Sequence, residues 1–264
     1  MGRRLLCLLA LLCLLAPSAR AEEPLTLPAC RTVEEVESLI LWPGEETQPV
    51  EAERGKVRYI SQDTKKDPDF CPEYWYGGEP GSDLDLTIEI CKQKGRFNQP
   101  YTYYARNMCT RAVYSMALSY LGVDLTPGAM SALLDKRDIN MHYEEVTELL
   151  PEVEMVTFTY DVFFSMFEAY QTDSSYSPVY LYIKRPNDTP HCLLVVAQRE
   201  DGRYIVIDPK YHNLQGESIL VYTIAINNVA RKISASDFRN ELKGSVITKC
   251  CQWRLIETEK EDSP

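Results

Sequence analysis

Histidine is scarce in this sequence, and the motifs that usually hold metals are missing. Only three histidines occur among 264 residues, namely His142, His191 and His212. There is no Cys-x-x-Cys or His-Glu-x-x-His motif, and the vicinal pair Cys250-Cys251 has poor geometry for shared ligation. A glycine-rich phosphate-binding loop is also missing. We therefore expect chemistry that needs neither a metal ion nor an organic cofactor.

Positive charge is also in short supply. Lysine and arginine total 28 against 39 acidic residues, which gives a formal net charge of −11. Such a chain repels a polyanion, so nucleic acid is not expected as a main partner. Hydrophobic residues make up 45% and charged residues 25% of the sequence, a balance that excludes a mainly disordered chain.

Residues 1–21 have the layout of a secretory signal peptide. Arg3 and Arg4 precede an apolar run over 5–16, and the small-x-small sequence Ala19-Arg20-Ala21 follows it. No later stretch reaches membrane-spanning length. We expect cleavage after Ala21 and a secreted or extracytoplasmic protein with no stable membrane insertion, the alternative being an uncleaved N-terminal anchor.

Seven cysteines lie beyond this cleavage site, and an odd number leaves at least one thiol without an intramolecular partner. Outside the cytosol, paired thiols oxidise. We interpret residues 22–95 as an N-terminal extension stapled by disulfides, since it holds Cys30, Cys71 and Cys91. It could cover a groove, bind a partner or brace the fold. The unpaired thiol is either functional or a buried spare cysteine.

Periodicity predicts an α+β arrangement, in which helices come first and a run of antiparallel strands follows. The motif Asp201-Gly202 predicts a hairpin between two of these strands. We assign residues 96–258 to one domain and 259–264 to an acidic tail. Expected helices cover 33–42, 107–122, 126–134, 143–150, 161–170 and 236–242, and expected strands cover 56–61, 178–184, 192–199, 204–207, 218–226 and 246–256.

Three side chains far apart in the sequence form a candidate catalytic set. Cys109 opens the long helix, where the helix dipole and unpaired N–H groups favour a thiolate. His191 begins one strand of the predicted hairpin and Asp208 follows its partner strand, so both lie at the same end of the ladder. An aspartate there can orient the imidazole as a base for the thiol. Cys192 follows His191 on the strand, so we expect it to face the opposite side, in the core or in a disulfide.

The segments QPYTYYARNMCTRAVYSMALSYLGVDLTP and HCLLVVAQREDGRYIVIDP resemble the bacteriocin-processing, or C39-like, branch of the papain-like cysteine peptidases. The resemblance covers roughly 99–209 and implies a papain-like fold. It implies that Cys109 is the nucleophile, His191 the base and Asp208 the orienter, in the papain order. It also implies Gln99 as the oxyanion-hole amide. Two positions depart from the family: Thr110 replaces the usual glycine, and Tyr103 stands where that glutamine is usual.

The resemblance thus predicts a cysteine peptidase that cleaves peptide or amide bonds in a peptide or protein substrate. Two alternatives stay open. Thr110 and the displaced Gln99 favour a catalytically inactive C39-like binding or interaction module. A third hypothesis is acyl transfer, in which an amine intercepts the thioester. Cys109 could instead be a disulfide partner. Substrate specificity, disulfide pairing and oligomeric state are not determined by the sequence.

Overall fold

The computed structural model describes residues 31–42, 51–60, 62, 109–125, 127, 143–157, 159–209, 213–214, 217–218, 220–227, 229–236 and 242–256. The predicted signal peptide, the acidic tail and most of the predicted helix over 126–134 lie outside these residues, as do Gln99, Cys30, Cys71 and Cys91. The expected disulfide staple depends on these last three cysteines. The four described cysteines are all free, and they are Cys109, Cys192, Cys250 and Cys251.

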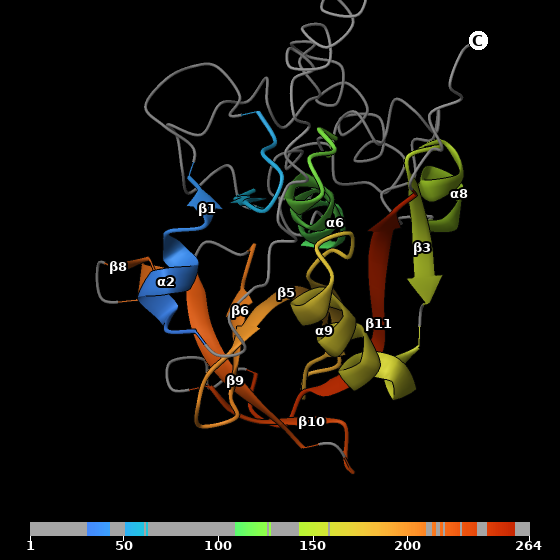
Figure 1. Ribbon diagram of the computed structural model, residues 1–264. Helices are drawn as coiled ribbons and strands as arrows, with labels where there is room; N and C mark the ends of the chain where they lie inside the picture. The colour runs from blue at the N-terminus through green and yellow to red at the C-terminus, as the bar shows by residue number, and fades with distance from the viewer. Residues whose placement is uncertain are drawn as a thin grey trace, which may run out of the picture.

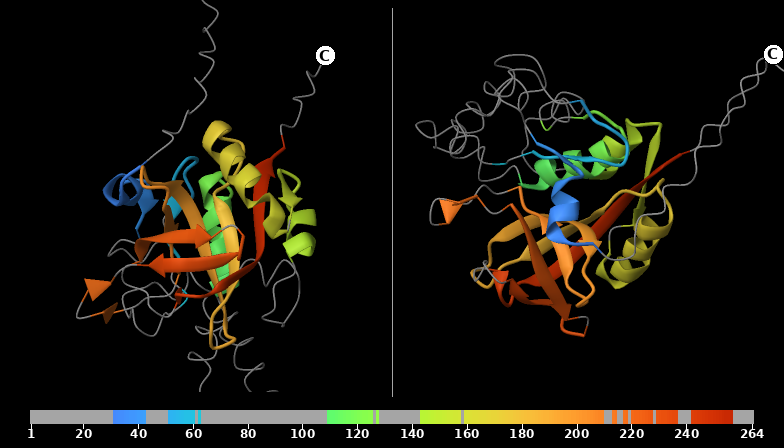
Figure 2. Two further views of the ribbon diagram at one scale, coloured as in Figure 1. Left: turned by 90° about the horizontal axis from the view of Figure 1, so that it is seen from below. Right: turned by 60° about the vertical axis from the view of Figure 1, so that its left-hand side comes forward.

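A curved antiparallel sheet of seven described strands forms the body of the protein (Figure 1). Its strand order is β10-β9-β6-β5-β4-β11-β3, and every pairing in it is antiparallel. One further pairing, Lys232 with Val246, joins β10 to β11, so the sheet curls back on itself (Figure 2). The strands are β3 (Val153–Thr157), β4 (Val179–Lys184), β5 (Pro190–Gln198), β6 (Tyr204–Ile207), β9 (Val221–Asn227), β10 (Lys232–Ser236) and β11 (Val246–Leu255).

The helix α6 (Cys109–Tyr120) is the buried centre of the fold. It contacts β5, β4 and β11 of the sheet, and eleven of its twelve residues are buried. A helix that is buried on all sides needs an apolar or internally bonded surface all round, and the sequence AVYSMALSY supplies it. The other described helical elements are α2 (Val33–Glu37), α8 (Tyr143–Glu148), η1 (Tyr160–Val162) and α9 (Phe163–Thr172).

Within the described part of the chain, no helix is both long and apolar enough to cross a membrane.

The described part of the N-terminal extension packs against this body. Strands β1 (Ile40–Leu41) and β2 (Val57–Arg58) pair in parallel, and β2 lies beside α6 (Figure 1). Two hydrogen bonds fix this contact: the Gly55 amide donates to the Tyr120 carbonyl at 2.8 Å, and the Arg58 amide donates to Ser119 Oγ at 2.9 Å. This segment therefore helps to hold α6 in place.

The α+β class and the central hairpin are confirmed. β6 has the expected bounds, and Gly202 takes the left-handed conformation of a tight turn, with φ of 79°. Four strands were missed, namely β1, which lies inside the expected helix over 33–42, β3, β10 and a short strand at Asn213–Leu214. β3 pairs with β11, and β10 pairs with β9. Of the helix expected over 236–242, residues 237–241 lie outside the described residues, and Ser236 belongs to β10. Ser236 is a strand residue because it pairs with Ile224 of the neighbouring strand β9. Local propensity does not reveal such a partner. A third, short pair is β7 (Asn213–Leu214) with β8 (Glu217–Ser218).

Candidate active site

Cys109 is the first residue of α6, as the sequence predicted. Its thiol is free and 8% exposed. Because the helix starts at this residue, its first N–H groups have no partner within the helix and their dipoles favour negative charge there. The position alone therefore favours a thiolate.

His191 and Asp208 meet through a direct hydrogen bond. His191 Nε2 lies 2.8 Å from Asp208 Oδ1, and both side chains are almost completely buried. Register explains the contact. Leu194 pairs with Ile207, so Asp208 falls opposite Leu193, two residues from His191. Residues two apart on a strand share a face, and such a diagonal pair is within reach of long side chains.

The Asp208 carboxylate is held from several directions. Tyr222, on β9, donates a hydrogen bond from its hydroxyl to Asp208 Oδ2 at 2.7 Å. The Asp208 amide donates to the Leu220 carbonyl at 2.8 Å, and the Tyr59 hydroxyl donates to the Asp208 carbonyl at 3.3 Å. A carboxylate with both oxygens engaged has little rotational freedom, so it fixes the orientation of the imidazole bonded to it.

Cys109 lies close enough to His191 for each side chain to shift the pKa of the other. Asp208 occupies Nε2 of the ring, which leaves Nδ1 for the thiol. The structure thus brings together Cys109, His191 and Asp208, three of the four candidate site residues, while the fourth, Gln99, lies outside the described residues. Tyr103 lies outside them as well.

The electrostatics of the site favour an ion pair. Hydrogen bonding from Cys192 lowers the pKa of Cys109 well below the ordinary thiol value; burial opposes this, and His191 and Thr110 lower it further. Burial lowers the pKa of His191, but the charge and hydrogen bond of Asp208, with the contact to Cys109, outweigh burial and raise it. A low thiol pKa beside a high imidazole pKa is the condition for a thiolate–imidazolium pair.

Cys192 is completely buried in the core, as expected from the sequence, and it also lies near Cys109. Its sulfur lies 3.4 Å from Thr110 Oγ1 and 2.8 Å from the Tyr180 hydroxyl, and Cys109 raises its pKa. Alternation along β5 fixes the direction in which a side chain leaves the strand, but it does not say where a neighbouring helix begins. Because α6 begins against this end of β5, both His191 and Cys192 reach Cys109.

Sequence reasoning also missed Tyr222, Tyr180 and Tyr59. No local pattern marks them, since each acts from a different strand or segment and only the pairing of β6 with β9 brings Tyr222 to Asp208.

Among the described residues, no cluster of three or more His, Cys, Asp or Glu side chains is arranged to hold a metal ion.

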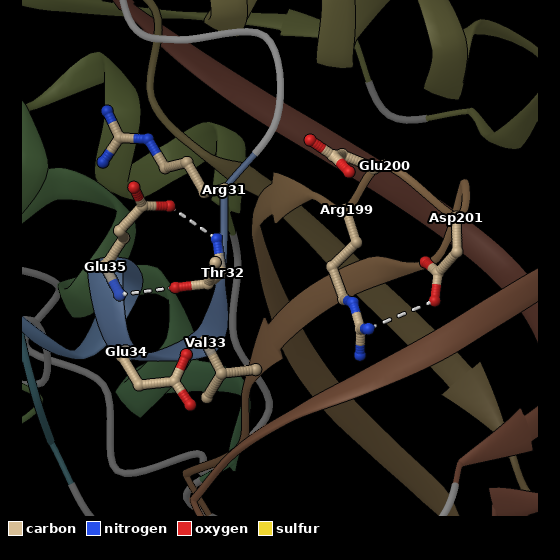
Figure 3. Close-up of a pocket in the computed structure, with 8 residues that line it drawn as sticks. All are labelled: Arg31, Thr32, Val33, Glu34, Glu35, Arg199, Glu200 and Asp201. Atoms are coloured by element: carbon tan, nitrogen blue, oxygen red, sulfur yellow. Dashed lines mark hydrogen bonds and ion pairs between the residues drawn. The ribbon is translucent and has the colours of Figure 1, made fainter.

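A pocket of about 560 Å³ lies between α2 and the β5–β6 turn (Figure 3). It contains Arg31 and Arg199 and the carboxylates of Glu34, Glu35, Glu200 and Asp201. Two contacts link residues of its lining: the Glu35 carboxylate accepts from the Thr32 backbone amide at 2.6 Å, and Arg199 pairs with Asp201 at 3.4 Å. The lining does not include Cys109, His191 or Asp208, so we do not place the candidate active site in this pocket.

No protein-family model matches the sequence, and no curated protein matches it.

Proposed function

We propose that this chain is a papain-like cysteine hydrolase of the C39-like group, which cleaves peptide or amide bonds outside the cytoplasm. The observation that carries the proposal is the continuous contact chain from Cys109 through His191 and Asp208 to Tyr222. A thiol at a helix start, an imidazole and an orienting carboxylate are the parts that nucleophilic acyl transfer needs. A helix packed on an antiparallel sheet, with the nucleophile at its start, is also what a papain-like fold requires.

In this mechanism the Cys109 thiolate attacks the carbonyl carbon of the scissile bond. The His191 imidazolium then gives its proton to the leaving amine, and a thioester remains on Cys109. Neutral His191 next takes a proton from water, which attacks the thioester and releases the acid. Asp208, held by Tyr222, keeps the ring in one orientation and stabilises its charged form throughout.

The oxyanion of the tetrahedral intermediate needs donors. The Cys109 backbone N–H is one candidate, because the first amides of a helix have no partner within that helix. Gln99 is the second candidate on the strength of the family resemblance. Thr110 carries a Cβ where the family usually has glycine, and its hydroxyl is 3.4 Å from the Cys192 sulfur.

Burial supports a second candidate function. Cys109 is 8% exposed, and His191 and Asp208 are 2% and 1% exposed. Side chains shielded from solvent to this degree are compatible with a non-catalytic C39-like module that binds a partner without acyl transfer.

One experiment separates these functions. The protein is mixed with an activated ester, such as a nitrophenyl ester, and the early release of the phenol is followed by stopped flow. A hydrolase gives a burst close to one equivalent and an acyl adduct on Cys109 in intact mass spectra, and Cys109→Ser abolishes both. A binding module gives neither signal. Adding a primary amine tests acyl transfer, since the amine would then appear in the product.

A further inference from the structure

The chain holds a second thiol beside its nucleophile. The side chains of Cys109 and Cys192 lie close enough for each to shift the pKa of the other, and neither cysteine is in a disulfide. The Thr110 hydroxyl, one residue along the helix, is 3.4 Å from the Cys192 sulfur, which confirms independently that the start of α6 lies against this thiol. A cysteine next to Thr110 is close to Cys109 in space, and a disulfide between neighbouring cysteines needs Cα atoms about 4.4–6.8 Å apart.

The two thiols differ in access. Cys109 is 8% exposed, whereas Cys192 is completely buried beneath it and packed against Tyr180. A small oxidant therefore meets Cys109 first. The reactivity of the two cysteines toward an oxidant follows the same order, because the thiolate is the form of cysteine that attacks a peroxide. The pKa of Cys109 is lowered, while burial, followed by the contact with Cys109, raises the pKa of Cys192.

Oxidation of Cys109 would itself activate Cys192. Two of the causes that raise the pKa of Cys192, the hydrogen bond to Cys109 and its negative charge, depend on the Cys109 thiolate. A sulfenic acid at Cys109 is neutral, so that charge is lost. The hydroxyl groups of Thr110 and Tyr180, which lower the pKa of Cys192, stay in contact with its sulfur.

We propose that Cys109 and Cys192 form an oxidation site, at which a hydroperoxide converts the nucleophile into a reversible Cys109–Cys192 disulfide. In the first step the Cys109 sulfur attacks one peroxide oxygen, the O–O bond breaks and hydroxide (or an alkoxide) leaves. The sulfur is oxidised to a sulfenic acid and the peroxide is reduced. In the second step the Cys192 sulfur attacks the Cys109 sulfur, the S–O bond breaks, and the Cys192 proton and the hydroxyl group leave as water.

The disulfide would remove the attacking thiolate and protect it from irreversible oxidation. Its consequence for catalysis rests on the proposed function, whereas its formation does not. The other described thiols are not equivalent partners. The Cys250 thiol donates to the Thr159 carbonyl, and burial raises the pKa of Cys250 to about 12. The completely buried Cys251 thiol also has a raised pKa, again because of burial.

The folded protein is treated with dilute hydrogen peroxide, the remaining thiols are blocked with an alkylating agent, and the products are mapped by mass spectrometry. We expect one new cross-link, between the peptides that contain Cys109 and Cys192, and we expect dithiothreitol to restore an alkylatable Cys109. In Cys192→Ser we expect Cys109 to accumulate sulfinic acid that dithiothreitol does not reverse, several-fold faster than in the unmodified protein.

Cys251→Ser is the matched control, since Cys251 is also completely buried and has no contact with the nucleophile among those described. This variant should form the cross-link like the parent protein. Cys192→Ala provides a second variant in case the serine hydroxyl is poorly accommodated, and circular dichroism checks that each variant is folded. Irreversible oxidation of Cys109 at equal rates with and without Cys192, or a cross-link that joins Cys109 to another cysteine, would overturn the proposal. A cross-link without any acyl adduct in the ester experiment would retain the oxidation site and reject the hydrolase.

Discussion

The hydroxyl of Tyr222 donates a hydrogen bond to Oδ2 of Asp208 at 2.7 Å, on the side of the carboxylate that does not bind His191. This contact joins β9 to the end of β6 and fixes the carboxylate within a buried environment. Tyr222 is therefore a positioning residue, which acts on the imidazole through Asp208.

Replacement of Tyr222 by phenylalanine should remove the hydrogen bond to Asp208 while the aromatic ring keeps the same packing. The loss of one hydrogen bond to a charged buried group costs about 1.5–3 kcal/mol, and we expect kcat to fall roughly tenfold as a result. KM should hardly change, because Tyr222 is expected to have no contact with substrate. The control Tyr176→Phe removes a hydroxyl that contacts Arg254 at the other side of the fold, and it should leave kcat unchanged. Equal kcat in the parent protein and Tyr222→Phe would contradict this role.

The pH dependence should separate thiol reactivity from turnover. Because the pKa of Cys109 is lowered, its alkylation should stay fast well below the ordinary thiol value of 9.0 and should slow only as the pH falls through the lowered pKa. The pKa of His191 is raised, so the imidazolium that protonates the leaving group is lost only as the pH rises through that raised value. Alkylation should therefore give a single rise with pH, while peptide hydrolysis should give a bell. Alkylation of Cys109 with its midpoint at the ordinary thiol pKa would argue against the ion pair.

The β5–β6 turn offers a test of the hairpin that aligns His191 with Asp208. Gly202 has φ of 79°, and nothing lies within 4 Å of the position where a Cβ would stand. Gly202→Ala should therefore lower the free energy of unfolding by about 1 kcal/mol through backbone strain alone. Gly202→Asn should lower it less, because asparagine tolerates the left-handed region. Urea titration with unchanged slope measures both. Alanine and asparagine with the same stability would contradict a strained turn.

The core should be most sensitive at Trp253, which is completely buried in β11. Its ring packs edge-on against the ring of Tyr114 in α6, with 4.3 Å between the ring centroids. Its Nε1 donates a hydrogen bond to Thr147 Oγ1 at 3.2 Å. Trp253→Ala should lower the free energy of unfolding by about 3–5 kcal/mol, since it removes a large side chain and a hydrogen bond. Val229 is 98% exposed, so Val229→Ala should have no measurable effect in the same urea titration.

Much of the central architecture could be predicted from sequence, because local signals agree with the final structure there. The apolar residues of α6 recur at helical spacing, and β6 lies next to a turn whose Asp-Gly pair permits only a narrow set of conformations. β3 and β10 were missed for a different reason. Both contain charged or small polar residues, such as Glu154 and Lys232, and they are strands because β11 and β9 offer them partners.

The candidate site also has a part that sequence could indicate and a part that it could not. Cys109, His191 and Asp208 could be named as candidates from residue type and position, because the hairpin places His191 and Asp208 at the same end of the ladder. The exact register could not be predicted: the pairing of β5 with β6 shifts between Val195 and Ala197, and His191 and Asp208 meet as a diagonal pair. The contacts of Cys192 and Tyr222 depend on where α6 begins and on how β9 pairs. Neither feature leaves a mark in the local sequence.

The central claim is that His191 activates Cys109, and the rate of alkylation at Cys109 near neutral pH tests it most directly. The folded protein and its His191→Ala variant are treated with dilute iodoacetamide, and labelling of each cysteine is followed by peptide mapping. We predict that Cys109 reacts faster than Cys250 and Cys251, whose thiols have raised pKa values because of burial, and that His191→Ala slows Cys109 about tenfold or more. Equal rates at Cys109 in the two proteins, or no preference for Cys109 in the parent, would contradict the account.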